Sequence, residues 1–200
     1  MTDLSAKDAL RAEKVRTPKA QRDWQVSRVL LHACREQVMS ESIESLSHSG
    51  GHALLAQSRS GWRIGVDLEK IRPRRVLALA EWACSHDEVA WLHSQPDDSA
   101  RLMHFYMLWT LKEAFIKACS LSFPADLRRY GLSVSHGQPP ALRAPAGAWR
   151  ARSYQLEGGW VASVVWLPAP GGLTAEEPEW RAGPVGPLPA IELLGAWTRA

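Results

Sequence analysis

The chain has 200 residues, of which 46% are hydrophobic, and its 24 basic and 21 acidic side chains give a formal net charge of +3. This is enough apolar material for one domain or two small halves, and the charge is too mild to indicate a nucleic-acid binder. The three cysteines lack metal-binding spacing and no run of about 18 apolar residues occurs. We therefore expect reduced thiols rather than disulfides, and a cytoplasmic protein with no membrane span.

The first predicted element is a helix within residues 8–38, because four apolar residues recur there at spacings of three and four. They are Val26, Val29, Leu30 and Ala33. The next segment, "SLSHSGGH" at residues 45–52, is predicted to be a compact polar loop. Its hydroxyls, imidazole and backbone N–H groups can hold phosphate oxygens, although an ordinary turn before a strand would use the same residues.

Two strands joined by a tight turn are predicted at residues 52–58 and 62–69. Residues 74–93 are expected to be helical again, and Ser85 with Glu88 has the spacing of a capping box. The capping box marks a helix N-terminus inside this region.

A long helix is predicted at residues 98–119, with Asp97 or Asp98 as its N-cap. Three segments after it alternate like strands of an antiparallel sheet, at residues 130–137, 149–157 and 159–167. Residues 168–189 are rich in proline and glycine and are expected to be irregular, and residues 189–197 favour a short helix. The pattern as a whole indicates an α+β fold.

The stretch "GVDLE" places two acids on one face of a predicted strand, because side chains alternate between the two faces. Asp67 and Glu69 therefore share a face with Gly65, and the two carboxylates lie about 7 Å apart along the strand. One interpretation is a solvated acidic edge. The other is a cation site, with the glycine leaving room for a ligand to approach the backbone.

The stretch "WTLKEAFIK" is amphipathic, with an apolar stripe on one side of the predicted helix. The stripe consists of Leu108, Leu111, Phe115 and Ala118. Glu113 and Lys117 lie on the opposite side, and Lys112 flanks them. This is either a surface salt bridge worth roughly 0.3–0.5 kcal/mol or one wall of a cleft. If Glu113 meets Asp67 and Glu69, the three carboxylates form a hard oxygen site suited to magnesium.

The motifs SHS, GVDLE and WTLKEAFIK, in this order, resemble those of the 4′-phosphopantetheinyl transferase superfamily, and specifically its Sfp-like branch. The resemblance implies an α+β fold built as a pseudo-twofold pair of halves, with antiparallel sheets and packed helices, and a first half that is shorter here than usual. The expected division is an N-terminal half at residues 1–60, a C-terminal half at 61–167 and a tail at 168–200.

The resemblance also implies a reaction, in which the phosphopantetheine arm of coenzyme A is transferred to a serine of a carrier protein and adenosine 3′,5′-bisphosphate leaves. Asp67, Glu69 and Glu113 would hold Mg²⁺, with Mn²⁺ as a possible substitute. Glu113 is also the expected general base, and its carboxyl should have a raised proton affinity beside two other carboxylates. Lys117, assisted by Lys112, would stabilise charge on the departing phosphate.

Further coenzyme A contacts are expected by resemblance from the SHS motif and the first helix. They are Ser47, His48, Arg28, Lys19 and Arg22. For Lys19 and Arg22, a solvated helix face is an equally good interpretation. The expected partners are coenzyme A and an acyl or peptidyl carrier protein, with secondary metabolism as the looser expectation, and the chain is expected to be a monomer that binds neither nucleic acid nor membrane.

Two alternatives stay open from the sequence. A metal-dependent nuclease or phosphodiesterase could use the same acids and lysine, but it does not account for the SHS motif, and the weak net charge disfavours strong binding to a phosphate backbone. A non-catalytic relative could bind coenzyme A or a carrier protein. The intact acids and lysine favour an enzyme over this second alternative.

Overall fold

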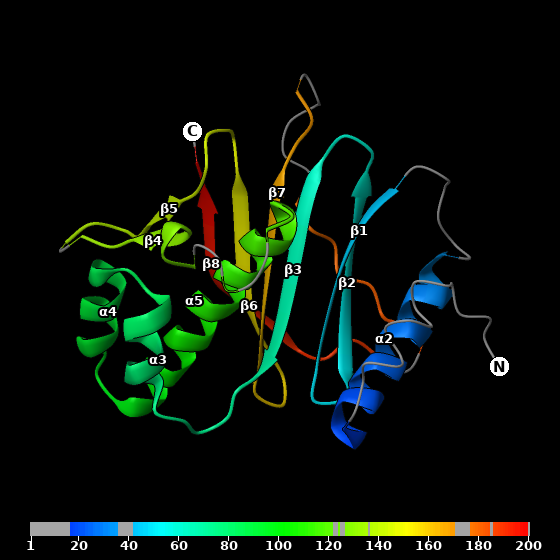
Figure 1. The fold of residues 1–200 in the computed structure, drawn as a ribbon, viewed down its shortest axis with the longest axis horizontal. Helices are drawn as coiled ribbons and strands as arrows, with labels where there is room; N and C mark the ends of the chain where they lie inside the picture. Colours follow the sequence, from blue (N-terminus) through cyan, green and yellow to red (C-terminus); the bar gives the residue numbers. More distant parts are fainter. Residues whose placement is uncertain are drawn as a thin grey trace.

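A computed structural model describes residues 17–35, 42–121, 124, 127–135, 137–170, 177–184 and 186–199. The mixture of helices and antiparallel sheets confirms the α+β class (Figure 1). The ends of the predicted first helix, residues 8–16 and 36–38, lie outside the described residues. No helix within the described ranges is both long and apolar enough to cross a membrane.

The main elements follow the chain from helix to hairpin, then helices, then a sheet. They are α2 (Pro18–Arg35), β1 (Ser42–Ser49), β2 (His52–Arg59), β3 (Arg63–Lys70), α3 (Val76–Ala83), α4 (His86–His93), α5 (Asp98–Ala118), the short 3₁₀ helix η1 (Leu127–Arg129), β4 (Gly131–Ser133), β5 (Ala141–Arg143), β6 (Arg150–Leu156), β7 (Trp160–Leu167) and β8 (Ile191–Thr198).

Three antiparallel sheets organise these elements. The largest has the strand order β3-β7-β6-β8, while β1 with β2 and β4 with β5 form separate two-stranded sheets. Figure 1 shows the β1–β2 hairpin between α2 and β3, so the hairpin continues the layer of the larger sheet. The short helices α3 and α4 lie at the other end of the molecule, near β4 and β5, and α5 runs from there across the face of the larger sheet to β3.

The long helix α5 packs directly on β3, and a glycine makes this possible. A Cβ added to Gly65 would lie 1.9 Å from the carbonyl oxygen of Ala114 and 2.6 Å from the N atom of Ala118, both on the α5 backbone. The expectation that Gly65 leaves room for a ligand is therefore wrong, because the helix backbone fills that room. The close approach places the carboxylates of β3 against the polar face of α5.

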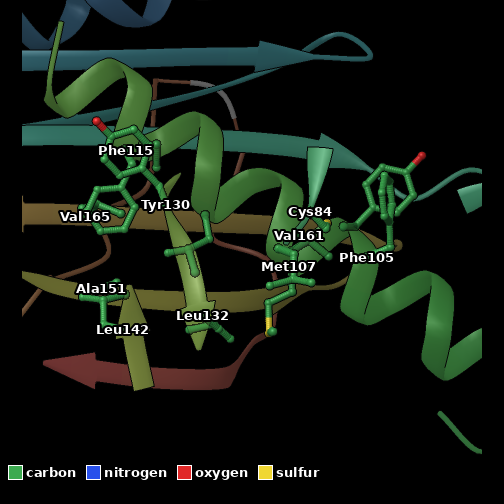
Figure 2. Packing of buried hydrophobic residues seen from close by; sticks show 14 of the residues in the cluster. Cys84, Phe105, Met107, Phe115, Tyr130, Leu132, Leu142, Ala151, Val161 and Val165 are labelled. Carbon is green, nitrogen blue, oxygen red and sulfur yellow. The ribbon is translucent and has the colours of Figure 1, made fainter. Parts of the chain in front are cut away.

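The core lies between α5 and the large sheet, and aromatic rings fill much of it (Figure 2). Phe115 stacks on Tyr130 with ring centroids 5.5 Å apart and contacts Trp149 at 5.4 Å. A second apolar cluster on the opposite face of the sheet contains Val66 and Leu68. β3 is thus apolar on one face and carries its acids on the other, as its alternation predicts.

The SHS segment is a strand, not the predicted loop. Residues 45–49 belong to β1, which pairs with β2 through a two-residue turn at Gly50 and Gly51. Both glycines have positive φ, 53° and 83°, which suits this kind of hairpin turn. Serines are uncommon signals for a strand, but here β3 supplies partners for their hydroxyls.

The end of the chain also differs from expectation. Residues 191–198 form strand β8, which pairs with β6, whereas a short helix was predicted at residues 189–197. Gly195 weakens a helix by about 1 kcal/mol, and the edge of β6 offers backbone hydrogen bonds to a strand. The β8 strand extends the sheet, so this part of the predicted tail belongs to the fold. β5 was not predicted.

The helix caps agree with the sequence. Ser85 and Glu88 form the reciprocal capping box at the start of α4, and Asp97 caps α5 by accepting from the N–H of Ala100 at 2.8 Å. The predicted helix at residues 74–93 is divided into α3 and α4 at this capping box.

Candidate active site

Two elements bring three acids and a lysine together. Asp67 and Glu69 lie on β3, and Glu113 and Lys117 lie one turn apart on α5. The ammonium of Lys117 donates to Asp67 Oδ1 at 2.8 Å and to the Val66 carbonyl at 2.9 Å. Lys117 therefore reaches across to the strand. The two motifs form one cluster, and the acids of β3 are not a solvated edge.

Asp67 is the most buried member of this cluster, with 3% of its surface exposed. Its Oδ1 accepts from both Lys117 and Ser47. Its Oδ2 is buried and has no hydrogen-bond partner among the residues that the structure describes. An unpartnered carboxylate oxygen is costly to bury, so this atom indicates where a cation or a donor of a ligand belongs.

Glu113 is half-buried and its environment favours the protonated acid. Burial, followed by the negative charges of Asp67 and Glu69, raises the pKa of its carboxyl to about 7, while Lys117 acts in the opposite direction. The expected rise in proton affinity is thus present. A carboxyl with a pKa near neutrality can exchange a proton under physiological conditions.

The donor chemistry of the cluster suits a hard cation such as Mg²⁺, which prefers carboxylate oxygens. Within the described part of the chain, no three His, Cys, Asp or Glu side chains are grouped closely enough to form a metal site as they stand. Lys117 is the cation that contacts Asp67 in this arrangement. The Oδ2 atom of Asp67 is nevertheless available as a ligand, so the residues present fit a metal ion. Coordination of that ion by all three carboxylates stays a prediction.

Ser47 and His48 point in different directions because they are neighbours on a strand. Ser47 is 5% exposed; its hydroxyl donates to Asp67 Oδ1 at 2.7 Å and accepts from the N–H of Leu68 at 3.1 Å. A serine hydroxyl has a single proton, so Ser47 has no donor left for a phosphate. Ser47 is therefore engaged with Asp67 and β3, and its contact with coenzyme A phosphates stays a prediction.

His48 is exposed and borders a cavity of about 340 Å³. Desolvation lowers the pKa of its imidazole, Asp23 opposes this, and the charges of Lys117 and Arg28 act in the same direction as desolvation. Arg28 on α2 is thus near enough to His48 to influence it. His48 lines the larger cavity, whereas Arg28 lines neither cavity, and the expected contacts of both residues with coenzyme A stay predictions.

The remaining predicted residues of α2 are only partly placed. Arg22 borders a neighbouring cavity of about 300 Å³. The backbone of Lys19 lies in α2, but its side chain is outside the described part of the structure. Arg28 has its Nε 3.4 Å from the hydroxyl of Ser27 and lies over the ring of Trp24.

Three basic residues that were not predicted also lie at the site. Lys70, Arg72 and Arg74 line the larger cavity together with Glu69, and Arg72 borders the smaller one. They belong to a run of four basic residues in the six positions that follow "GVDLE". That run of basic residues was the sequence signal that could have predicted a phosphate-binding surface here.

Lys112 is not at the site. Its ammonium is fully buried on another face of α5, where it pairs with Glu88 at 2.8 Å and donates to the carbonyls of Leu127 and Tyr130. The expectation that Lys112 assists at the phosphate is wrong, because adjacent helix residues point about 100° apart. Its spacing of three from Phe115, within the apolar stripe, was the signal for an inward position.

Residues 63–165, just over half of the chain, match the model of the family described as the 4′-phosphopantetheinyl transferase superfamily. This range contains β3, α5 and all four side chains of the acid and lysine cluster.

Several curated relatives are similar to the same region. The chain is 36% identical over 101 residues to the 4′-phosphopantetheinyl transferase psf-1 of Bacillus pumilus, covering 50% of this chain and 42% of that protein. It is 37% identical over 103 residues to the 4′-phosphopantetheinyl transferase AcpT of Escherichia coli, covering 47% and 50%. It is 33% identical over 97 residues to the L-aminoadipate-semialdehyde dehydrogenase-phosphopantetheinyl transferase of Xenopus laevis, covering 46% and 32%. The matched region thus spans half or less of each of these relatives.

Proposed function

The chain belongs to the 4′-phosphopantetheinyl transferase superfamily, and on this basis we propose that it transfers the 4′-phosphopantetheine arm of coenzyme A to a serine hydroxyl of an apo carrier protein. Adenosine 3′,5′-bisphosphate would be the other product. The observation that carries this proposal is the meeting of Asp67, Glu113 and Lys117, which Glu69 links to a cavity lined by three basic side chains. The acids suit proton transfer and metal binding, and the basic side chains suit a phosphorylated donor.

The cavity supports coenzyme A as the donor. Lys70, Arg72 and Arg74 outnumber the two acids of its walls, Asp23 and Glu69, and His48 adds an imidazole. Arginine and lysine side chains recognise phosphate oxygens through charge-assisted hydrogen bonds. Coenzyme A carries negative charge at two places, its pyrophosphate and its 3′-phosphate. Two neighbouring cavities lined by basic side chains match this distribution of charge.

Asp67, Glu69 and Glu113 would hold Mg²⁺, or Mn²⁺ in its place. When bound, the metal would neutralise negative charge on the pyrophosphate oxygens and polarise the phosphorus under attack. The buried Oδ2 of Asp67 supports this assignment, since it is otherwise unsatisfied. Glu69 supports it because it borders the cavity.

In the remaining steps, Glu113 acts on the incoming serine and Lys117 on the departing phosphate. The hydroxyl oxygen of the acceptor serine forms a bond to the phosphorus that carries pantetheine, and Glu113 accepts the hydroxyl proton. The bond from that phosphorus to the bridging oxygen of the pyrophosphate breaks, and the electron pair leaves with adenosine 3′,5′-bisphosphate. Lys117, whose side chain is 30% exposed, can reach the departing phosphate from its position beside Asp67.

Intact-mass spectrometry tests the proposal directly. An apo carrier protein is incubated with this chain, coenzyme A and Mg²⁺, and the expected result is a mass gain equal to one phosphopantetheine. Omitting the metal, or using the Glu113→Gln variant, should abolish the gain. Carriers from fatty-acid, polyketide and nonribosomal-peptide synthesis should each be used, because the acceptor and its pathway stay predictions. No gain with any carrier, although coenzyme A binds, would indicate a non-catalytic relative.

A further inference from the structure

Three serines at alternate positions of β1 face β3. Ser45, Ser47 and Ser49 are all buried, while the residues between them are more exposed. Alternate residues of a strand share one face, so the three hydroxyls form a row directed at the neighbouring strand. β1 and β3 lie side by side in Figure 1 but belong to different sheets. The row of hydroxyls is therefore part of what joins the hairpin to the larger sheet.

Two of these hydroxyls hold the backbone of β3. The N–H of Val66 donates to Ser45 Oγ at 3.0 Å, and the N–H of Leu68 donates to Ser47 Oγ at 3.1 Å. The serines thus accept hydrogen bonds that a neighbouring strand's carbonyls would accept in a continuous sheet. Ser45 and Ser47 share this structural role.

Ser47 and Ser49 have a second contact of a different kind, because each donates to a carboxylate. Ser47 Oγ donates to Asp67 Oδ1 at 2.7 Å, and Ser49 Oγ donates to Glu69 Oε2 at 2.9 Å. Among the described residues, the only hydrogen bond of the Ser45 hydroxyl is the one that it accepts from the N–H of Val66. The two serines that face the acids are therefore distinguished from the one that does not.

The hydrogen bond from Ser47 decides which oxygen of Asp67 is left over. Ser47 and Lys117 both donate to Oδ1, so Oδ2 stays buried without a partner. A carboxylate held at one oxygen cannot rotate freely, and its other oxygen keeps a fixed direction. Ser49 restricts Glu69 in the same way at Oε2, beside the cavity.

We infer that Ser47 and Ser49 are positioning residues that orient Asp67 and Glu69 toward the cation, instead of binding the phosphates of the donor. This inference rests on the proposed function, since it assigns a role to the serines within that site. Hydrogen-bond donors to metal-binding carboxylates set their direction, and removing such partners typically weakens metal affinity or activity about 10- to 100-fold.

The three serines supply a matched set of variants. Ser45→Ala and Ser47→Ala each remove one acceptor for a β3 N–H, but only Ser47→Ala also removes a donor to an acid. Ser49→Ala removes a donor to an acid and leaves both of these backbone contacts intact. Asp67→Asn, which removes the charge of a proposed ligand, serves as the control for the site.

The readouts are Mn²⁺ affinity, measured by electron paramagnetic resonance in the presence of coenzyme A, and stability, measured by urea unfolding. We expect Ser47→Ala and Ser49→Ala to bind Mn²⁺ at least about 10-fold more weakly than wild type. Ser45→Ala should stay within about twofold of wild type for Mn²⁺, even though it loses stability as Ser47→Ala does. If Ser47→Ala does not fold, Ser49→Ala carries the test.

Two results would overturn the inference in distinguishable ways. Mn²⁺ binding by wild type that Asp67→Asn weakens, with unchanged affinity in Ser47→Ala and Ser49→Ala, would show that the serines do not position the acids and would leave the proposed function standing. Absence of any Mn²⁺ binding that depends on Asp67 would refute the metal site of the proposed function, and the inference with it.

Discussion

Replacing Lys112 by methionine should destabilise the protein strongly without removing any group of the active site. Lys112 and Glu88 are both fully buried and pair at 2.8 Å. Glu88 also contacts Arg143 at 2.9 Å and accepts from the N–H of Leu132 at 2.8 Å. The pair therefore joins α4, α5 and the β4–β5 hairpin inside the core.

The magnitude follows from what the substitution leaves behind. Removing one partner of a buried ion pair typically costs about 3–5 kcal/mol, because the other charge is left uncompensated. The carbonyls of Leu127 and Tyr130 would also lose their donor, and a buried unsatisfied group costs roughly 1–3 kcal/mol. Arg143 remains beside Glu88 and offsets part of this. We therefore expect a loss of about 3–5 kcal/mol in the free energy of unfolding.

Urea unfolding followed by tryptophan fluorescence measures this loss, and Lys117→Met is the matched control. Lys117 is 30% exposed and Ser47 still donates to its partner Asp67, so its replacement should cost less stability than that of Lys112 while abolishing transfer. The double variant Lys112→Met with Glu88→Gln should recover part of the loss, because no uncompensated carboxylate then stays buried. A Lys112→Met protein that unfolds at the wild-type urea concentration, yet has lost transfer activity, would refute the reasoning and return Lys112 to the active site.

Three further predictions concern packing, pH and thiol reactivity. Gly65→Ala places a Cβ 1.9 Å from the carbonyl of Ala114, so we expect a loss of at least ~1–3 kcal/mol in unfolding free energy, measured in urea; wild-type stability would contradict the close packing. Burial opposes ionisation of Asp87, but hydrogen bonds from Ser85 and other donors lower the pKa of its carboxyl to about 2. The ionised carboxylate therefore stabilises the fold above about pH 4, and this contribution disappears as the pH falls to about 2. The stability difference between wild type and Asp87→Asn should therefore shrink between pH 6 and pH 3, and a constant difference would contradict this. Burial raises the pKa of Cys84 to about 12, so iodoacetamide at pH 8 should modify this thiol, identified by peptide mass spectrometry, only after unfolding.

Local signals in the sequence determined several elements correctly. The capping box at Ser85 and the N-cap at Asp97 appear where predicted, because a side chain can satisfy the first N–H groups of a helix using only its neighbours in sequence. The period-two alternation of "GVDLE" likewise placed Asp67 and Glu69 on one face of β3. The three ordered motifs also identified the family, which the match over residues 63–165 supports.

Features that depend on partners distant in sequence were decided by the tertiary structure. The serines of β1 resembled a polar loop until β3 supplied N–H groups and acids to bond them. Lys112 was expected to assist Lys117 at the departing phosphate, although its buried partner Glu88 lies 24 positions earlier in the chain. Residues 191–198 became a strand because the edge of β6 was available to pair with them.

The basic residues after "GVDLE" show the same contrast between what the sequence determines and what the tertiary structure determines. Their charges are evident in the sequence, but a cavity forms beside them only because α2 packs on the β1–β2 hairpin and β1 packs against β3. A local pattern determines which hydrogen bonds and faces a segment can form by itself. Which way the side chains of that segment point, how deeply they are buried and what they bind depend on the distant elements that pack against it. These features are therefore determined only by the tertiary structure.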